Sequence, residues 1–265
     1  MPSMTWKEVE EAFKGNPVVM FPLGSVEEHG PHAPIGDYRM AETLAIEVAE
    51  KVGNAVVLPV LPFGYSEYFK GFPGCLSLKP FSLYNVVKDV CDCVLDFGID
   101  HLLFINGHKG DEPILDFVGR DIRRERGIVL ASVGPWSCLT PDLNKILYGD
   151  KATDVGHGSE PMGSLGMHFY PDQMRLDLME SSKRVRDYGD FELAGPSLLK
   201  LHGVPVMFYQ HYHEVASNGV MGDPNLASAE RGQKMHQWIV ERLVEVVKVF
   251  QKLDTKARPG PCGTL

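Results

Sequence analysis

Short apolar runs alternate with helical patterns along most of this 265-residue chain. The strand-like runs cover residues 17–22, 55–61, 101–105, 128–133 and 204–208. The helical patterns cover residues 5–14, 37–52, 80–97, 112–126 and 226–252. Strands joined through helices run parallel, and both faces of such a sheet are buried under the helices. The alternation therefore predicts an α/β fold with a mainly parallel central sheet.

Size and charge narrow the class of protein further. A chain of 265 residues with 44% hydrophobic content can bury a large core, and we expect one domain over residues 1–265. The formal net charge of -9 argues against a nucleic-acid-binding protein and against one that binds anionic membranes. We expect a small-molecule substrate.

The five cysteines are odd in number and show no CxxC spacing, so we expect free thiols. The first residues lack a cationic segment followed by an apolar one, and no apolar run reaches the length of a membrane span. Both observations predict a cytoplasmic protein.

Residues 22–37, PLGSVEEHGPHAPIGD, follow the first apolar run and have the composition of a metal site. In an extended backbone Glu27 and His29 project from the same face, about 6.5–7 Å apart at Cα. A solvated surface loop is the alternative, but it does not need the unusual backbone path that the glycines and prolines impose. Asp37 is also a plausible N-cap for the helix that follows.

Two more polar clusters stand beside apolar segments. Residues 106–112, NGHKGDE, follow the third run, where ligands of parallel sheets bind, and His108 stands there as a second ligand candidate. A tight turn capped by Asp111 is the alternative. In residues 154–161, His157 and Glu160 could be metal ligands, acid–base groups or helix caps, since Glu160-Pro161 also suits a helix start.

Five motifs together resemble the creatininase family of metal-dependent amidohydrolases. They occur in the family's order and at roughly its intervals: PLGSVEEHGPHAPIGD, FGYSEYFKGFPGCLSL, FINGHKGDE, GHGSEPMGS and GVMGDPNLASAERG. The resemblance implies a three-layer α/β/α fold, a homohexamer, and a centre of two divalent ions, either zinc or manganese, with iron in some members.

Matched motif by motif, Glu27 and His108 resemble ligands of one metal ion and His29 a ligand of the other. Asp37 resembles the bridging carboxylate, provided that the threonine usual before it is deleted here; an ungapped alignment would place Tyr38 there instead. A neutral phenol is a poor bridge, so we favour the deletion.

Two departures bear on the second metal ion and on the substrate. Creatininase carries a glutamate ligand two residues after the motif histidine, where this chain has Gly110. Glu160, Glu112, Asp111 or water must then complete the second site, and we favour Glu160. The family's ETS triplet is changed here to Met-Gly-Ser at residues 162–164, which makes creatinine a doubtful substrate.

The chemistry implied is attack on a carbonyl by a metal-activated water. His157 is the favoured acid for the leaving group, and Glu160 could serve if it is not bound to metal. The loops that should overhang the site supply the candidate substrate-binding residues, namely Tyr65, Ser66, Glu67, Phe72, Lys109 and Trp136. His211 and His213 alternate in QHYHE, and we expect a strand there at a subunit contact or pocket rim.

Three functional hypotheses remain. The first is an amidohydrolase that opens a cyclic amide or cleaves a small linear one. The second is a carbon–carbon bond hydrolase that opens a cyclic diketone such as a keto-inositol in polyol catabolism. The third is a metal-binding maturation factor without activity, which the intact candidate ligands argue against.

Overall fold

A four-stranded parallel sheet forms the centre of the molecule, as the alternation predicted. The computed structural model describes residues 1–183 and 185–263. The strands lie in the order β2-β1-β3-β4, so β1 and β3 are central and β4 is an edge. Their bounds are β1 Val18–Leu23, β2 Ala55–Val57, β3 Leu102–Asn106 and β4 Ala131–Val133.

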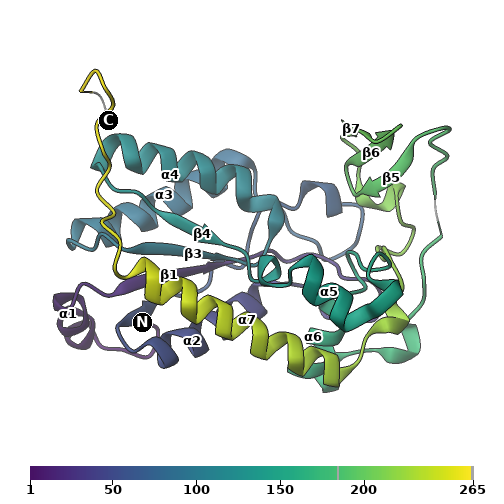
Figure 1. The fold of residues 1–265 in the computed structure, drawn as a ribbon, viewed down its shortest axis with the longest axis horizontal. Coiled ribbons are helices and arrows are strands. Elements are labelled where there is room, and N and C mark those ends of the chain that lie inside the picture. The colour runs from purple at the N-terminus through teal and green to yellow at the C-terminus, as the bar shows by residue number, and fades with distance from the viewer. Residues whose placement is uncertain (184, 264–265) are drawn as a thin grey trace.

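Helices cover both faces of this sheet, which makes the fold a three-layer α/β/α sandwich (Figure 1). One face packs against α2 (Tyr38–Val52) and α7 (Ala229–Phe250), and the other packs against α3 (Pro80–Asp96) and α4 (Glu112–Arg126). Neighbouring residues of β1 point into opposite layers, and all six are buried. This explains why the strand reads as an uninterrupted apolar run.

The other α-helices of the described residues lie before β1 and after β4. They are α1 (Trp6–Lys14), α5 (Pro141–Tyr148) and α6 (Met162–Phe169). The helix α6 packs closely against α7, where the Cα of Gly232 approaches the backbone of Ser164 too closely for any side chain. The start of α6 at Met162 agrees with the helix start that Glu160-Pro161 suits.

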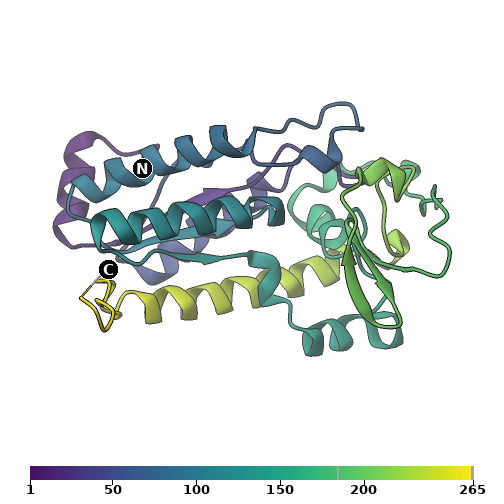
Figure 2. The same cartoon turned by 90° about the horizontal axis from the view of Figure 1, so that it is seen from above.

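The fifth apolar run, residues 204–208, does not join the parallel sheet. It supplies β7 (Val204–Met207) of a separate antiparallel sheet with β5 (Glu192–Gly195) and β6 (Leu198–Leu201). His202 and Gly203 both have positive φ, which suits the two-residue turn that joins β6 to β7. This sheet and α1 lie at opposite ends of the molecule (Figures 1 and 2), and all four residues of β7 are exposed.

All five cysteines are free thiols, as predicted. In the described part of the chain, no helix combines the length and the apolar character that crossing a lipid bilayer requires.

Candidate metal centre

The carboxyl ends of β1 and β3 lie side by side, because Leu23 pairs with Asn106 in the parallel register. The backbone N–H of Gly107 donates to the Leu23 carbonyl at 2.8 Å, which joins the two turns. Gly24 lets the start of α2 approach, since a Cβ there would overlap the Asp37 carboxylate and the Tyr38 backbone. The predicted ligands from two motifs are thereby brought to one edge of the sheet.

The first candidate ion group consists of Glu27, Asp37 and His108, which are all buried. His108 Nδ1 lies 2.9 Å from Glu27 Oε2 and 3.3 Å from Asp37 Oδ2. Since His108 Nε2 lies 2.9 Å from the Tyr65 carbonyl oxygen, which can only accept, Nε2 carries a proton and Nδ1 faces the carboxylates. A hydrogen bond from one ring nitrogen to a backbone carbonyl orients the other nitrogen of a metal-binding histidine in this way.

The charges of this group favour a positive charge between the two carboxylates. Burial and the nearby Glu27 raise the pKa of Asp37 to about 7. Burial also disfavours the charged form of Glu27, but His108 outweighs it and lowers the pKa of Glu27 to about 2. The pKa of His108 is raised despite its burial, because both carboxylates favour a positive charge on the ring. A divalent ion would supply that charge in place of the proton.

Asp37 stands at the N-cap position of α2 but does not cap it. Its side chain makes no capping hydrogen bond, and Oδ1 instead accepts from the Ser25 backbone N–H at 2.6 Å. The capping alternative is therefore wrong, and the carboxylate points toward Glu27 and His108. The ring of Tyr38 lies against Gly36 instead, in agreement with the one-residue deletion that we favoured.

The second candidate ion group shares Glu27 and adds His29 and His157. His29 Nε2 lies 3.4 Å from Glu27 Oε1, and the rings of His29 and His157 stack at 4.8 Å. Burial and the nearby His157 lower the pKa of His29 to about 3, which keeps the imidazole neutral, as a metal ligand must be.

Glu28 holds His157 in place. His157 Nε2 lies 2.6 Å from the Glu28 carbonyl oxygen and 3.2 Å from its Oε1, which leaves Nδ1 free to face an ion or a substrate. The Gly30 backbone N–H donates to Glu28 Oε2 at 2.7 Å, and Gly219 packs against the same carboxylate. Burial lowers the pKa of His157, but Glu28 outweighs it and the net direction is upward.

Glu160 lies outside both groups, so the ligand role that we favoured for it is not supported. Its carboxylate accepts from the Ser164 backbone N–H at 3.1 Å and from the Ser164 hydroxyl at 2.5 Å, and Arg231 lies 3.8 Å away. These contacts are those of a cap at the start of α6, where a carboxylate favours the helix dipole. The capping role that the sequence left open is the one that this geometry favours.

Gly110 leaves no room for the glutamate that creatininase carries there. A Cβ at this position would overlap the Tyr68 hydroxyl, His108 Nε2 and the Tyr65 carbonyl. Asp111, another alternative ligand, is also outside both groups: its Oδ1 accepts from the Tyr65 N–H at 2.7 Å. The third member of the second group is therefore His157.

The predicted substrate-binding residues divide into supporting and peripheral ones. The Ser66 hydroxyl is buried, donates to Glu27 Oε2 at 3.1 Å and lies 3.1 Å from His108 Nε2. Trp136 Nε1 donates to the Gly107 carbonyl at 2.6 Å and braces the turn before His108. Both residues therefore shape the ligand geometry.

The other candidates lie farther out. Lys109 is exposed, and Glu67 pairs with Lys70 at 2.9 Å on the surface. Phe72 is half-buried against an aromatic cluster that includes Phe69. The contacts of these three side chains leave their substrate role a prediction.

Sequence reasoning missed the aromatic cover over His157, formed by Phe69 and Tyr212. The Phe69 ring lies 4.4 Å from the His157 ring, and Tyr212 lies 4.8 Å from both. Tyr212 begins a 3-10 turn where we expected a strand, while His211 and His213 on either side of it are exposed. The local pattern identified the histidines but held no signal for the buried tyrosine between them.

The chain is similar to known proteins of one family over most of its length. A family model described as "Creatininase: Creatinine amidohydrolase" matches residues 2–247. The chain is 31% identical to a creatinine amidohydrolase of Pseudomonas putida, over 92% of this chain and 94% of that protein.

Two other relatives have different activities in their names. A mycofactocin precursor peptide peptidase of Mycolicibacterium smegmatis is 26% identical, over 89% of this chain and 86% of the relative. A 3-dehydro-scyllo-inosose hydrolase of Thermotoga maritima is also 26% identical, over 93% and 81%.

Solved structures of creatininase have the same fold. A zinc–zinc form of a creatininase mutant matches with a TM-score of 0.77 and 25% identity, over 94% of this chain and 96% of that one. A manganese form matches with the same TM-score, 24% identity, and coverage of 94% and 97%. The two solved creatininases are thus named as zinc and manganese forms.

Proposed function

We propose, from the premise that the chain belongs to the creatininase family, that this hydrolase cleaves a carbon–nitrogen bond in a small cyclic amide with the help of divalent metal ions. The observation that carries the proposal is the sharing of Glu27 by two ligand groups at one sheet edge, in which every member is buried except the half-buried His157. Two neighbouring ion positions of this kind suit a pair of metal ions that act on one carbonyl.

The donor set fits a divalent ion. Both groups combine carboxylate oxygens with imidazole nitrogens, which are ligands that zinc and manganese accept. The buried His29 Nδ1 has no hydrogen-bond partner among the described residues, so a polar ligand would satisfy it. Glu27, Asp37 and His108 would hold one ion, and Glu27, His29 and His157 the other.

The residues around the two ion groups would have different roles in the reaction. Divalent ions held here would supply a water of lowered pKa and would polarise the substrate carbonyl. Ser66 and the Tyr65 carbonyl fix the orientation of His108, while Phe69 and Tyr212 exclude bulk water from the side of His157. In the absence of a bond to metal, His157 Nδ1 is the atom from which a proton could pass to the leaving nitrogen.

The space around Gly110 bears on the identity of the substrate. Gly110 has no space for a further carboxylate ligand, which separates this site from that of creatininase and disfavours creatinine. The alternative of a carbon–carbon bond hydrolase acting on a cyclic diketone is favoured by one observation, the relative named for 3-dehydro-scyllo-inosose.

A substrate screen distinguishes the amide hydrolase from the carbon–carbon bond hydrolase. Protein loaded with manganese or zinc is assayed against lactams, formamides and keto-inositols, beside the Glu27→Gln variant as a matched control. We expect turnover of at least one amide by the loaded wild type and none by the variant. Turnover of a keto-inositol alone would overturn the amidase proposal in favour of the alternative, and bound metal without any turnover would favour the maturation factor.

A further inference from the structure

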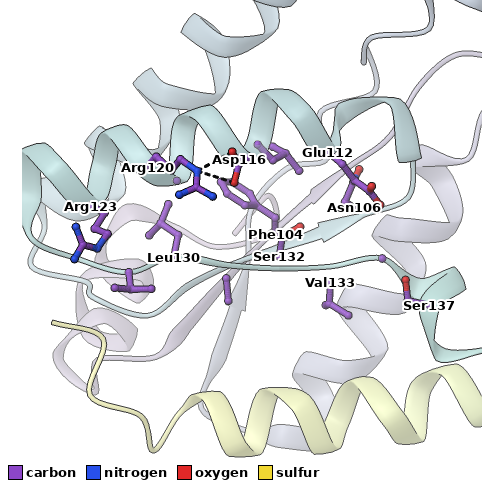
Figure 3. Close-up of a pocket in the computed structure, with 15 residues that line it drawn as sticks. Phe104, Asn106, Glu112, Asp116, Arg120, Arg123, Leu130, Ser132, Val133 and Ser137 are labelled. Carbon is purple, nitrogen blue, oxygen red and sulfur yellow. Dashed lines mark hydrogen bonds and ion pairs between the residues drawn. The ribbon is translucent and has the colours of Figure 1, made fainter. Parts of the chain in front are cut away.

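A groove of about 580 Å³ runs along the outer side of β4, and none of the proposed metal ligands lines it. Figure 3 shows it between α4 and the segment 129–134, with Arg120 and Arg123 at one end and Asn106 and Ser137 at the other. Its floor is apolar and includes Phe104, Leu115 and Leu130, which also belong to the core layer beneath α4.

Small residues create the groove. Gly119 faces it from α4, and a Cβ placed there would meet nothing within 4 Å. Ser132 faces it from β4 and is exposed. Because neither side chain fills the space, α4 covers the central strands but leaves the edge strand open.

The edge itself is suited to pairing with another strand. β4 pairs with β3 on its inner side, and within residues 1–183 and 185–263 no strand pairs with its outer side. Edge strands present backbone N–H and C=O groups that an extended peptide can pair with.

The chain's own C-terminal segment already uses the adjoining stretch in this way. The Val129 N–H donates to the Thr255 carbonyl and the Ala257 N–H donates to the Gly127 carbonyl, both at 2.7 Å. The pairing of Ile128 with Lys256 is antiparallel. The segment covers residues 127–129, and the groove opens where this cover ends.

The charges at the two ends of the groove are opposite. The Arg123 guanidinium donates to the Arg258 carbonyl, and no carboxylate among the described residues pairs with it. Glu112 lines the end near Asn106 and is exposed, and it has no ion-pair partner in the described part of the chain. An antiparallel strand would place its amino end at Glu112 and its carboxyl end at Arg123.

We propose that this groove binds an extended peptide segment of about six residues, which adds antiparallel to residues 130–134 with a positive charge at its amino end and a negative charge at its carboxyl end. Six residues of strand span about 16 Å between the first and the last Cα. The apolar side chains on one face of the segment would cover Leu115 and Leu130. This binding site is independent of the proposed hydrolysis.

Calorimetric titration of the full chain with two blocked hexapeptides tests the proposal. The first, Lys-Val-Thr-Val-Thr-Asp, is acetylated and amidated, and the second exchanges its two charged residues. We expect the first to bind in the micromolar range and at least tenfold more tightly than the second. Equal affinities, or no binding of either peptide at 1 mM, would overturn the proposal.

Two variants at one position locate the binding. Gly119→Leu fills the groove from the helix and should weaken binding of the first peptide at least tenfold, whereas Gly119→Ala should change it less than twofold. Both replace a glycine inside a helix, so both should fold at least as stably as the wild type. Unchanged binding of the first peptide by Gly119→Leu would overturn the proposal. Self-association of the wild type that Gly119→Leu abolishes would also overturn it, because the groove would then bind a second copy of the chain.

Discussion

The two candidate ion groups share Glu27 but differ in how the fold holds their other members. Asp37 directly precedes α2, and His108 is the second residue after β3, where strand register and close backbone contacts determine their positions. His157 comes from a loop before α6 and is held through Glu28 and the rings around it. We infer that the first group is preformed and that the second depends on contacts between distant segments.

Replacing the shared residue should have the largest effect. Glu27→Gln replaces one carboxylate oxygen by an amide NH2 and removes the negative charge that both groups share. We expect the loss of both ions and of about 10³-fold in kcat/KM, since metal ions contribute several kcal/mol to such reactions. Metal analysis and kinetics measure the two losses. Full metal content in this variant would show that the two groups do not share Glu27 as a ligand.

Single-histidine variants should separate the groups. His108→Ala removes a ligand of the first group only, and His29→Ala a ligand of the second only, so each variant should lose about one metal equivalent per chain. Quantitative metal analysis of the two proteins side by side checks this. If either variant lost both ions, the two positions would not be independent.

His157→Ala distinguishes a ligand from an acid. A general acid contributes about 10²–10⁴-fold to turnover, so an acid–base role predicts that loss with metal content nearly intact. Loss of one metal equivalent would instead assign His157 to the second ion. Glu28→Gln is the matched variant, because it weakens the support of the ring and leaves the imidazole present.

Glu160→Gln should have the smallest effect, and it should act on stability. The variant keeps the shape of the cap at α6 but leaves one acceptor oxygen for the two Ser164 donors, and we expect a loss of about 1 kcal/mol in the free energy of unfolding. Denaturant unfolding measures this change, and metal content should not move. A drop in bound metal would restore Glu160 as a ligand.

The parallel sheet and the first ion group could be predicted because their signals are local. Strands buried on both faces read as continuous apolar runs, and ligands of parallel sheets follow the strand ends. Glu27, His29 and His108 all lie within a few residues of such an end. The fold class and these three candidate ligands therefore followed from short stretches of sequence and from the family resemblance.

The other features depend on direction or on distant contacts. A carboxylate at a helix start can cap the helix or face a site: Asp37 does the second and Glu160 the first, although both occupy similar local patterns. The run at 204–208 has the composition of a core strand, and only the turn at residues 202–203 signals a hairpin. The contact between the rings of Tyr212 and His157 joins segments about fifty residues apart and leaves no local pattern.

Metal stoichiometry tests the central claim most directly. Wild-type protein is purified without chelator, loaded with manganese or zinc, freed of unbound ions and measured by elemental mass spectrometry. Two ligand groups that share Glu27 predict about two equivalents of divalent metal per chain. Fewer than one equivalent would contradict the account.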